Sequence, residues 1–140
     1  MTLAPLFILL LLLSGCLGKS EGEVRAVSPS KTGTFQQPYD QLAVCAKAYI
    51  ERDSWAFGKP TVHSTEETAQ SLIRVYASYL GSTLFEVTFQ PIPAVMTLVE
   101  YRHGYDGYAT QDQTWAIIER CAQQLAPPHF RVPLLPHRSP

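Results

Sequence analysis

The sequence has almost no net charge. Its 11 lysines and arginines balance 12 aspartates and glutamates, which leaves a formal net charge of -1. A domain that binds nucleic acid is expected to carry an excess of basic residues arranged as a stripe or patch. A protein held to anionic lipid by charge needs a similar basic cluster. The composition therefore indicates that nucleic acid is not a partner and that charge alone does not attach the chain to a membrane.

Motifs for metal binding are also missing. The sequence contains no HExxH, no CxxC and no DxDxDG loop, which are spacings that hold zinc or calcium. The histidines share no ligand spacing, and they are His63, His103, His129 and His137. We therefore expect no metal, no cofactor and no catalytic residue.

A single long hydrophobic run stands at the N-terminus. Residues 6–13 read LFILLLLL, and no charged residue occurs between positions 3 and 18. A membrane-spanning helix needs roughly 20 apolar residues, whereas the apolar part of a signal peptide needs about 7–15. The run ends in Leu13-Ser14-Gly15-Cys16. This segment resembles the lipobox of bacterial lipoproteins, in which a leucine and two small residues precede a cysteine.

The resemblance implies cleavage before Cys16, so that residues 1–15 are a signal peptide and lipid is attached to the Cys16 thiol and amine. It also implies an outer-membrane protein that faces the periplasm, because the residue after the cysteine is Leu17 and not the aspartate linked with inner-membrane retention. Two other interpretations of the run are an ordinary secretory signal with an incidental Cys16 and a single-pass membrane anchor.

The remaining chain predicts one domain between two unstructured ends. Residues 17–37 are polar and show no apolar period, which predicts that residues 16–37 hold the lipidated cysteine and a flexible tether. A single domain is expected over residues 38–127. Residues 128–140 are rich in proline and are expected to be a disordered tail.

Apolar spacing predicts a helix at each end of this domain. Residues 39–51 and 111–126 repeat apolar side chains at helical intervals, and the second segment stops at Pro127-Pro128. Between them, residues 52–63 are expected to form a loop that contains Trp55 and Phe57.

Alternation of apolar and polar residues predicts strands in the middle of the chain. It is clear over residues 83–90 and 95–102. Residues 71–80 also alternate, but residues 64–80 fit a helix too, and both interpretations stay open with a slight preference for a strand. The expected fold is α+β, with N- and C-terminal helices packed on a two- or three-stranded antiparallel meander. Its other face would carry ion pairs among Arg74, Glu86, Glu100 and Arg102.

The three cysteines suggest how sulfur is used. If Cys16 carries lipid, Cys45 and Cys121 remain, one in each predicted helix. Exported proteins meet an oxidising environment, so we predict a Cys45–Cys121 disulfide, with two buried free thiols as the alternative. The closed loop of 121 − 45 = 76 residue steps would stabilise the domain by about 4 kcal/mol in the chain-entropy model.

The segment 101–108, YRHGYDGY, is the strongest candidate for a contact site. Tyrosine and arginine are enriched where proteins bind partners, so Tyr101, His103, Tyr105 and Tyr108 are candidate contacts for an envelope protein or for peptidoglycan. The alternative is a long turn whose tyrosines cover the core. The sequence thus predicts a membrane-anchored, non-catalytic binding or assembly module. A cell-wall-acting enzyme, or an inhibitor of a secreted hydrolase, is the second hypothesis.

Overall fold

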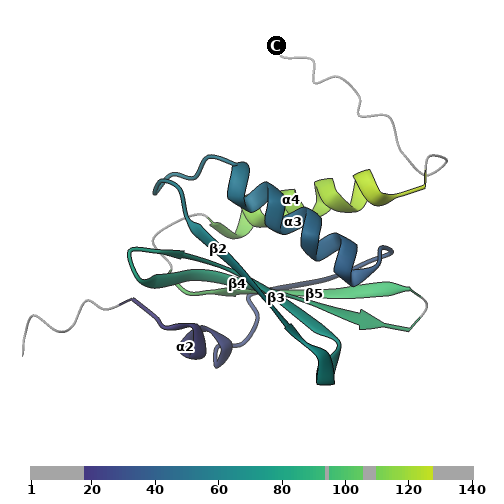
Figure 1. Ribbon diagram of the computed structural model, residues 1–140, viewed down its shortest axis with the longest axis horizontal. Coiled ribbons are helices and arrows are strands. Elements are labelled where there is room, and N and C mark those ends of the chain that lie inside the picture. The colour runs from purple at the N-terminus through teal and green to yellow at the C-terminus, as the bar shows by residue number, and fades with distance from the viewer. Residues whose placement is uncertain (1–17, 94, 106–109, 128–140) are drawn as a thin grey trace, which may run out of the picture.

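The computed structural model describes residues 18–93, 95–105 and 110–127. Within them an antiparallel sheet of five strands carries two long helices on one face and a short helix on the other (Figure 1). The elements in chain order are α2 (Glu21–Arg25), β1 (Lys31–Phe35), α3 (Tyr39–Arg52), β2 (Thr61–Glu67), the 3-10 turn η2 (Thr68–Gln70), β3 (Leu72–Tyr79), β4 (Ser82–Ile92), β5 (Met96–His103) and α4 (Thr110–Leu125).

The strands follow the order β1-β5-β4-β3-β2 across the sheet. β2 to β5 form a continuous meander, and β1, which precedes α3 in the chain, pairs with β5 at the far edge. The α+β class and the two helices on an antiparallel sheet are confirmed. The expected two or three strands are wrong, because two edge strands lie outside the predicted meander.

The strand interpretation of residues 71–80 is confirmed. β3 lies between β2 and β4, and Val75 pairs with Val87 at the centre of the sheet. Ile73, Val75 and Ala77 point to the helices, as the alternation indicated. Ser64 and Glu67 have the spacing of a helix capping box, but they do not start a helix, because both belong to the edge strand β2.

That edge strand, β2, takes residues 61–63 from the expected loop and residues 64–67 from the segment that also fitted a helix. Five of its seven residues are exposed, and only Val62 packs against the core. A strand stabilised by its backbone pairing to β3 needs little apolar alternation of its own. Its mostly polar sequence, TVHSTEE, therefore gives no periodic signal.

The prediction of a flexible tether over residues 16–37 is wrong for the part that the structure describes. Helix α2 starts with a capping box at Ser20 and buries Val24 completely against the second face of the sheet. β1 then pairs with β5 along its whole length. Residues 18–37 are part of the domain, and the remaining residues of the predicted tether, Cys16 and Leu17, lie outside the described residues.

β1 joins the sheet through close approach to α4. A Cβ added at Gly33 would lie 2.7 Å from the ring of Trp115, so only glycine leaves room for the indole over this strand. The same indole packs against Phe35, with ring centroids 5.8 Å apart, and lies 4.8 Å below the ammonium of Lys31. One aromatic residue of α4 thus covers most of β1.

The main core lies between the sheet and helices α3 and α4. The fully buried side chains include Leu42 and Ile50 from α3, Ile117 and Ile118 from α4, and Phe85, Val87, Phe89 and Val99 from the sheet.

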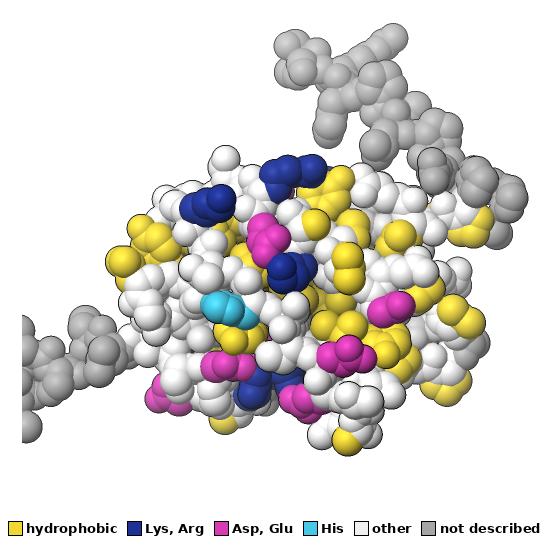
Figure 2. Space-filling view, in the orientation of Figure 1, with side chains coloured by type: hydrophobic (Ala, Val, Ile, Leu, Met, Phe, Trp, Pro, Cys, Tyr) yellow, Lys and Arg dark blue, Asp and Glu magenta, His cyan; other side chains and the backbone are white. Residues whose placement is uncertain are grey.

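On the face of the molecule shown in Figure 2, acidic and basic side chains are interspersed, and no broad patch has one sign.

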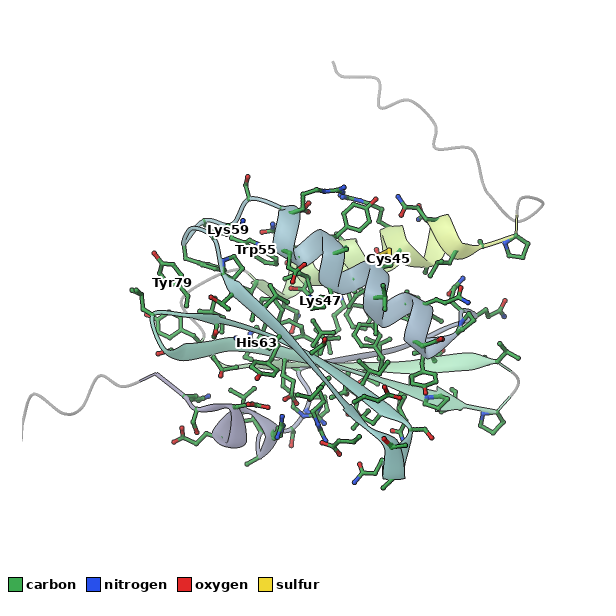
Figure 3. The ribbon with its side chains drawn as sticks, in the orientation of Figure 1. Cys45, Lys47, Trp55, Lys59, His63 and Tyr79 are labelled. Atoms are coloured by element: carbon green, nitrogen blue, oxygen red, sulfur yellow. A yellow bond between two sulfur atoms is a disulfide. The ribbon has the colours of Figure 1, made fainter. Side chains whose placement is uncertain are left out.

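The predicted disulfide is confirmed. Cys45 in α3 and Cys121 in α4 are joined across the helix pair, with their Cα atoms 5.8 Å apart (Figure 3). The bridge links the first long helix to the last one and closes most of the sheet into a covalent loop. The predicted tail, residues 128–140, lies outside the described residues.

Candidate functional site

The structure separates the members of the predicted contact segment 101–108. Tyr101 is fully buried, its ring stacks 5.5 Å from that of Phe85, and its hydroxyl lies 2.5 Å from Thr110 Oγ1. As a partner contact this residue is a wrong prediction. It occupies an inward position of β5, where the pleat sends every second side chain to the helices.

The other members of the segment lie further towards the surface. His103 is half-buried and meets the Tyr101 ring edge-on at 5.0 Å, while Tyr105 is 47% exposed. Tyr108 lies outside the described residues. Of the four predicted contacts, Tyr105 is the one with a large exposed surface in the described part of the chain.

The backbone places Tyr105 beside the start of β4. The amides of Gly104 and Tyr105 donate to the carbonyl of Leu84, at 2.8 Å and 3.1 Å. A Cβ at Gly104 would collide with the carbonyl of Thr83, so a glycine is required for this approach. The loop after β5 therefore begins against the turn between β3 and β4.

The first described residues reach the same end of the sheet. The Thr83 amide donates to the carbonyl of Lys19 at 3.0 Å, and a Cβ at Gly18 would collide with the Ser82 side chain. Segments from three parts of the chain thus meet here. We call this region the Leu80 end, and it consists of Gly18, Lys19, Leu80, Gly81, Ser82, Thr83 and Tyr105.

The turn at the Leu80 end has an unusual residue at its tip. Tyr79 pairs with Ser82, so Leu80 and Gly81 are the two central residues, with φ of 49° and 80°. A two-residue hairpin turn with both φ values positive favours asparagine, aspartate or glycine, because a left-handed backbone crowds the Cβ of other residues. Leu80 adopts it and is 88% exposed.

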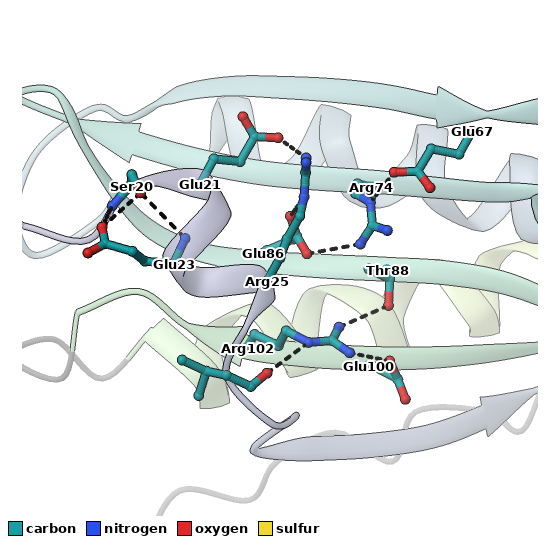
Figure 4. Close-up of polar contacts among 11 residues, drawn as sticks. Ser20, Glu21, Glu23, Arg25, Glu67, Arg74, Glu86, Thr88, Glu100 and Arg102 are labelled. Carbon is teal, nitrogen blue, oxygen red and sulfur yellow. Dashed lines mark hydrogen bonds and ion pairs between the residues drawn. The ribbon is translucent and has the colours of Figure 1, made fainter.

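The face of the sheet that packs against α2, opposite the two long helices, holds a network of charged side chains (Figure 4). Glu86 on β4 is fully buried and accepts hydrogen bonds from Arg25 Nε at 3.0 Å and Arg74 Nη1 at 3.3 Å. Arg74 also donates to Glu67 at 2.7 Å. That hydrogen bond lowers the pKa of Glu67 and raises the pKa of Arg74.

A second ion pair lies on the neighbouring strand. Arg102 donates to Glu100 at 2.7 Å, and its Nε donates to the carbonyl of Val27 at 3.2 Å. The ion pairs expected on this face are present, and Arg25 joins them from α2. Glu67, Glu86 and Glu100 each accept a hydrogen bond from a guanidinium group. The network therefore holds residues 18–27 on the sheet, and none of these three carboxylates is free for proton transfer.

One motif on the same segment went unnoticed in the sequence. Residues 18–22, Gly18-Lys19-Ser20-Glu21-Gly22, match GxSxG, the pattern of a hydrolase nucleophile. The Ser20 hydroxyl lies 2.7 Å from a carboxylate oxygen of Glu23 and accepts from the Glu23 amide. The Ser20 amide also donates to the Glu23 carboxylate at 2.6 Å, and this hydrogen bond, followed by that of the Ser20 hydroxyl, lowers the pKa of Glu23. These contacts are those of a helix cap and contain no histidine. The match therefore has a structural explanation.

The described residues contain no group of three histidine, cysteine, aspartate or glutamate side chains placed to hold a metal ion. None of their helices has both the length and the apolar character needed to cross a membrane. No protein-family model matches the chain. Among curated proteins no significant match is found either, so the functional argument depends on the residues themselves.

Proposed function

We propose that the chain is a lipoprotein of the bacterial cell envelope, anchored to the outer membrane through Cys16, whose domain binds or positions a partner without catalysis. The observation that carries this proposal is the Cys45–Cys121 disulfide. Disulfides persist in oxidising compartments such as the periplasm. Because the bridge uses two of the three cysteines, Cys16 is the one thiol left, and it stands in the lipobox-like segment.

The non-catalytic part of the proposal depends on how the polar groups are used. An enzyme site needs convergent polar side chains with perturbed pKa values in a pocket. The carboxylates of Glu67, Glu86 and Glu100 are each bound to an arginine. The exposed Tyr105 remains a candidate contact for an envelope protein or for peptidoglycan.

Labelling with palmitate in a bacterial host tests the anchor. The wild-type protein should take up label and sediment with membranes, and Cys16→Ala should do neither. A Cys45→Ala/Cys121→Ala double variant is the matched control, because it also loses cysteines but should keep the label. An unmodified Cys16 in the mass spectrum of the membrane-purified wild type would contradict the proposal.

A crosslinking pull-down from the same membranes tests the binding role. Tyr105→Ala should lose a partner that the wild type captures. Val44→Ala, which changes an exposed residue on α3 away from this site, should keep it. Identical partners with all three proteins would remove Tyr105 from the binding surface.

A further inference from the structure

We infer that the Leu80 end lies against the lipid headgroups of the membrane that holds Cys16, with Leu80 as its apolar contact. The inference depends on the proposed lipid anchor. It adds an orientation to it: the domain does not hang from a long tether, but sits on the bilayer by one end of its sheet.

The first argument is the length of chain between the anchor and the fold. Gly18 is already fixed beside Ser82, and only Leu17 separates it from Cys16. Two residues span at most about 7 Å when fully extended. The glycerol attached to a lipidated cysteine lies at the level of the headgroups. Gly18, and the β3–β4 turn packed on it, must therefore lie within about 7 Å of that layer.

The second argument is the residue at the tip of that turn. Leu80 combines 88% exposure with a left-handed backbone, and both are unfavourable for leucine in water. Strained, exposed residues of this kind persist where they serve a contact. At the bilayer boundary the leucine side chain leaves water and enters the apolar layer, and this burial of apolar surface is favourable.

Val95 shows that strain and exposure alone do not identify a membrane contact. It is also left-handed and 72% exposed, but it precedes β5 at the other end of the sheet. The eleven residues of β4 place the two turns about 30 Å apart. Position beside Gly18 therefore distinguishes Leu80, and Val95 provides a matched control.

The surroundings of Leu80 suit a headgroup layer. Tyrosine is enriched at membrane interfaces, where its ring is partly apolar and its hydroxyl is wet, and Tyr105 is half exposed at this end. Figure 3 places Lys59 on the same side of the molecule as Tyr79, the residue before Leu80. Lys59 is exposed and Lys19 is partly exposed. Their ammonium groups can reach lipid phosphates while the stems cover apolar surface.

The test uses the lipid-modified protein, purified from membranes and placed in phosphatidylethanolamine–phosphatidylglycerol nanodiscs that contain a trace of lipid with a gadolinium-chelate headgroup. Relaxation by gadolinium falls with the sixth power of distance. Amide signals of Lys19, Leu80 and Gly81 should lose more than half their intensity. Those of Val95 and Met96 should keep theirs. Equal losses at both ends, or larger losses at Val95, would overturn the inference.

Two variants test the role of Leu80 itself. Leu80→Asn should fold at least as stably as wild type, because asparagine tolerates the left-handed conformation. It should recover part of the lost intensity at Gly81, whereas Lys19, which the short link to Cys16 still holds near the headgroups, should keep its loss. Val95→Asn should leave the whole pattern unchanged. An unchanged pattern in Leu80→Asn would overturn Leu80 as the contact.

The same samples separate this inference from the proposed function. If the wild-type protein elutes without nanodiscs, as Cys16→Ala should, the anchor fails and the inference falls with it. If the wild type elutes with nanodiscs but its gadolinium losses show no preferred end, the anchor stands and the orientation is refuted.

Discussion

The buried carboxylate of Glu86 decides how firmly residues 18–27 are held on the sheet. It lies between two guanidinium groups, one from α2 and one from β3. Replacing it with glutamine keeps the shape of the side chain and removes the charge. The amide then has one oxygen to accept a hydrogen bond and one nitrogen that must face a second donor, so at least one arginine loses its partner on Glu86.

The size of the effect follows from how exposed the two arginines are. Breaking a fully buried ion pair costs about 3–5 kcal/mol. Here the side chain of Arg74 is 15% exposed and keeps Glu67, and that of Arg25 is 35% exposed and keeps Glu21. Water and the remaining carboxylates offset part of the loss. We therefore expect Glu86→Gln to lower the free energy of unfolding by about 2 kcal/mol, which is typical of a lost hydrogen bond to a charged group.

Urea unfolding of the domain measures this value. Glu100→Gln is the matched control, since Glu100 also faces an arginine but its side chain is 29% exposed, so its loss should cost less than about 1 kcal/mol. Amide exchange of residues 20–27 should accelerate in Glu86→Gln and not in Glu100→Gln. If the two variants are equally stable, or if Glu86→Gln matches wild type, the proposed role of Glu86 is refuted.

Two further predictions concern the disulfide and pH. Cys45→Ala/Cys121→Ala should lose about 4 kcal/mol of stability in urea, because the loop of 76 residues is no longer closed in the unfolded chain; a loss below about 1 kcal/mol would contradict this. Because Arg74 lowers the pKa of Glu67, the pair stabilises the fold above the unfolded pKa of about 4.3, and this contribution disappears as the pH falls through the lowered value. Thermal unfolding should therefore find Glu67→Gln less stable than wild type at pH 7 and equal to it at the lowest pH; a difference that does not depend on pH would contradict this.

The sequence predicted those elements whose side chains alternate or repeat strongly. β4 and β5 have inward positions that are almost all apolar, and α3 and α4 each bury a continuous stripe. Their boundaries agree with the expected ones within a few residues. The disulfide followed from counting cysteines and from the expected compartment.

The missed elements are held by contacts that leave no period in the sequence. α2 buries one side chain, Val24, and is otherwise fixed by a cap and by Arg25. β1 is a short edge strand whose glycine makes room for Trp115. The composition of such segments is like that of a linker. The residues that order them lie far along the chain and leave no pattern in the segment itself.

The candidate site was partly predictable for the same reason. Tyrosines in a glycine-rich segment suggested a surface, but Tyr101 falls on the inward side of β5 and belongs to the core. The sequence did not mark Leu80 as a candidate contact, because a Leu-Gly pair is not a typical hairpin signal. Its significance comes from two facts that the sequence does not contain, the left-handed backbone and the contact of the turn with Gly18.

If the proposed lipid anchor and orientation hold, the stability of α2 and the orientation on the membrane are coupled by this geometry. While Glu86 holds Arg25, one residue, Leu17, separates Cys16 from the domain. If α2 detaches, residues 18–27 become a flexible linker of ten residues, with an end-to-end distance of about 17 Å. The Leu80 end could then leave the headgroups while Cys16 stays inserted. In gadolinium-doped nanodiscs, Glu86→Gln should therefore recover signal at Gly81 together with faster amide exchange in residues 20–27, whereas Glu100→Gln should change neither. Recovery of signal at Gly81 while the amides of α2 stay protected from exchange would show that the orientation does not depend on how residues 18–27 are held.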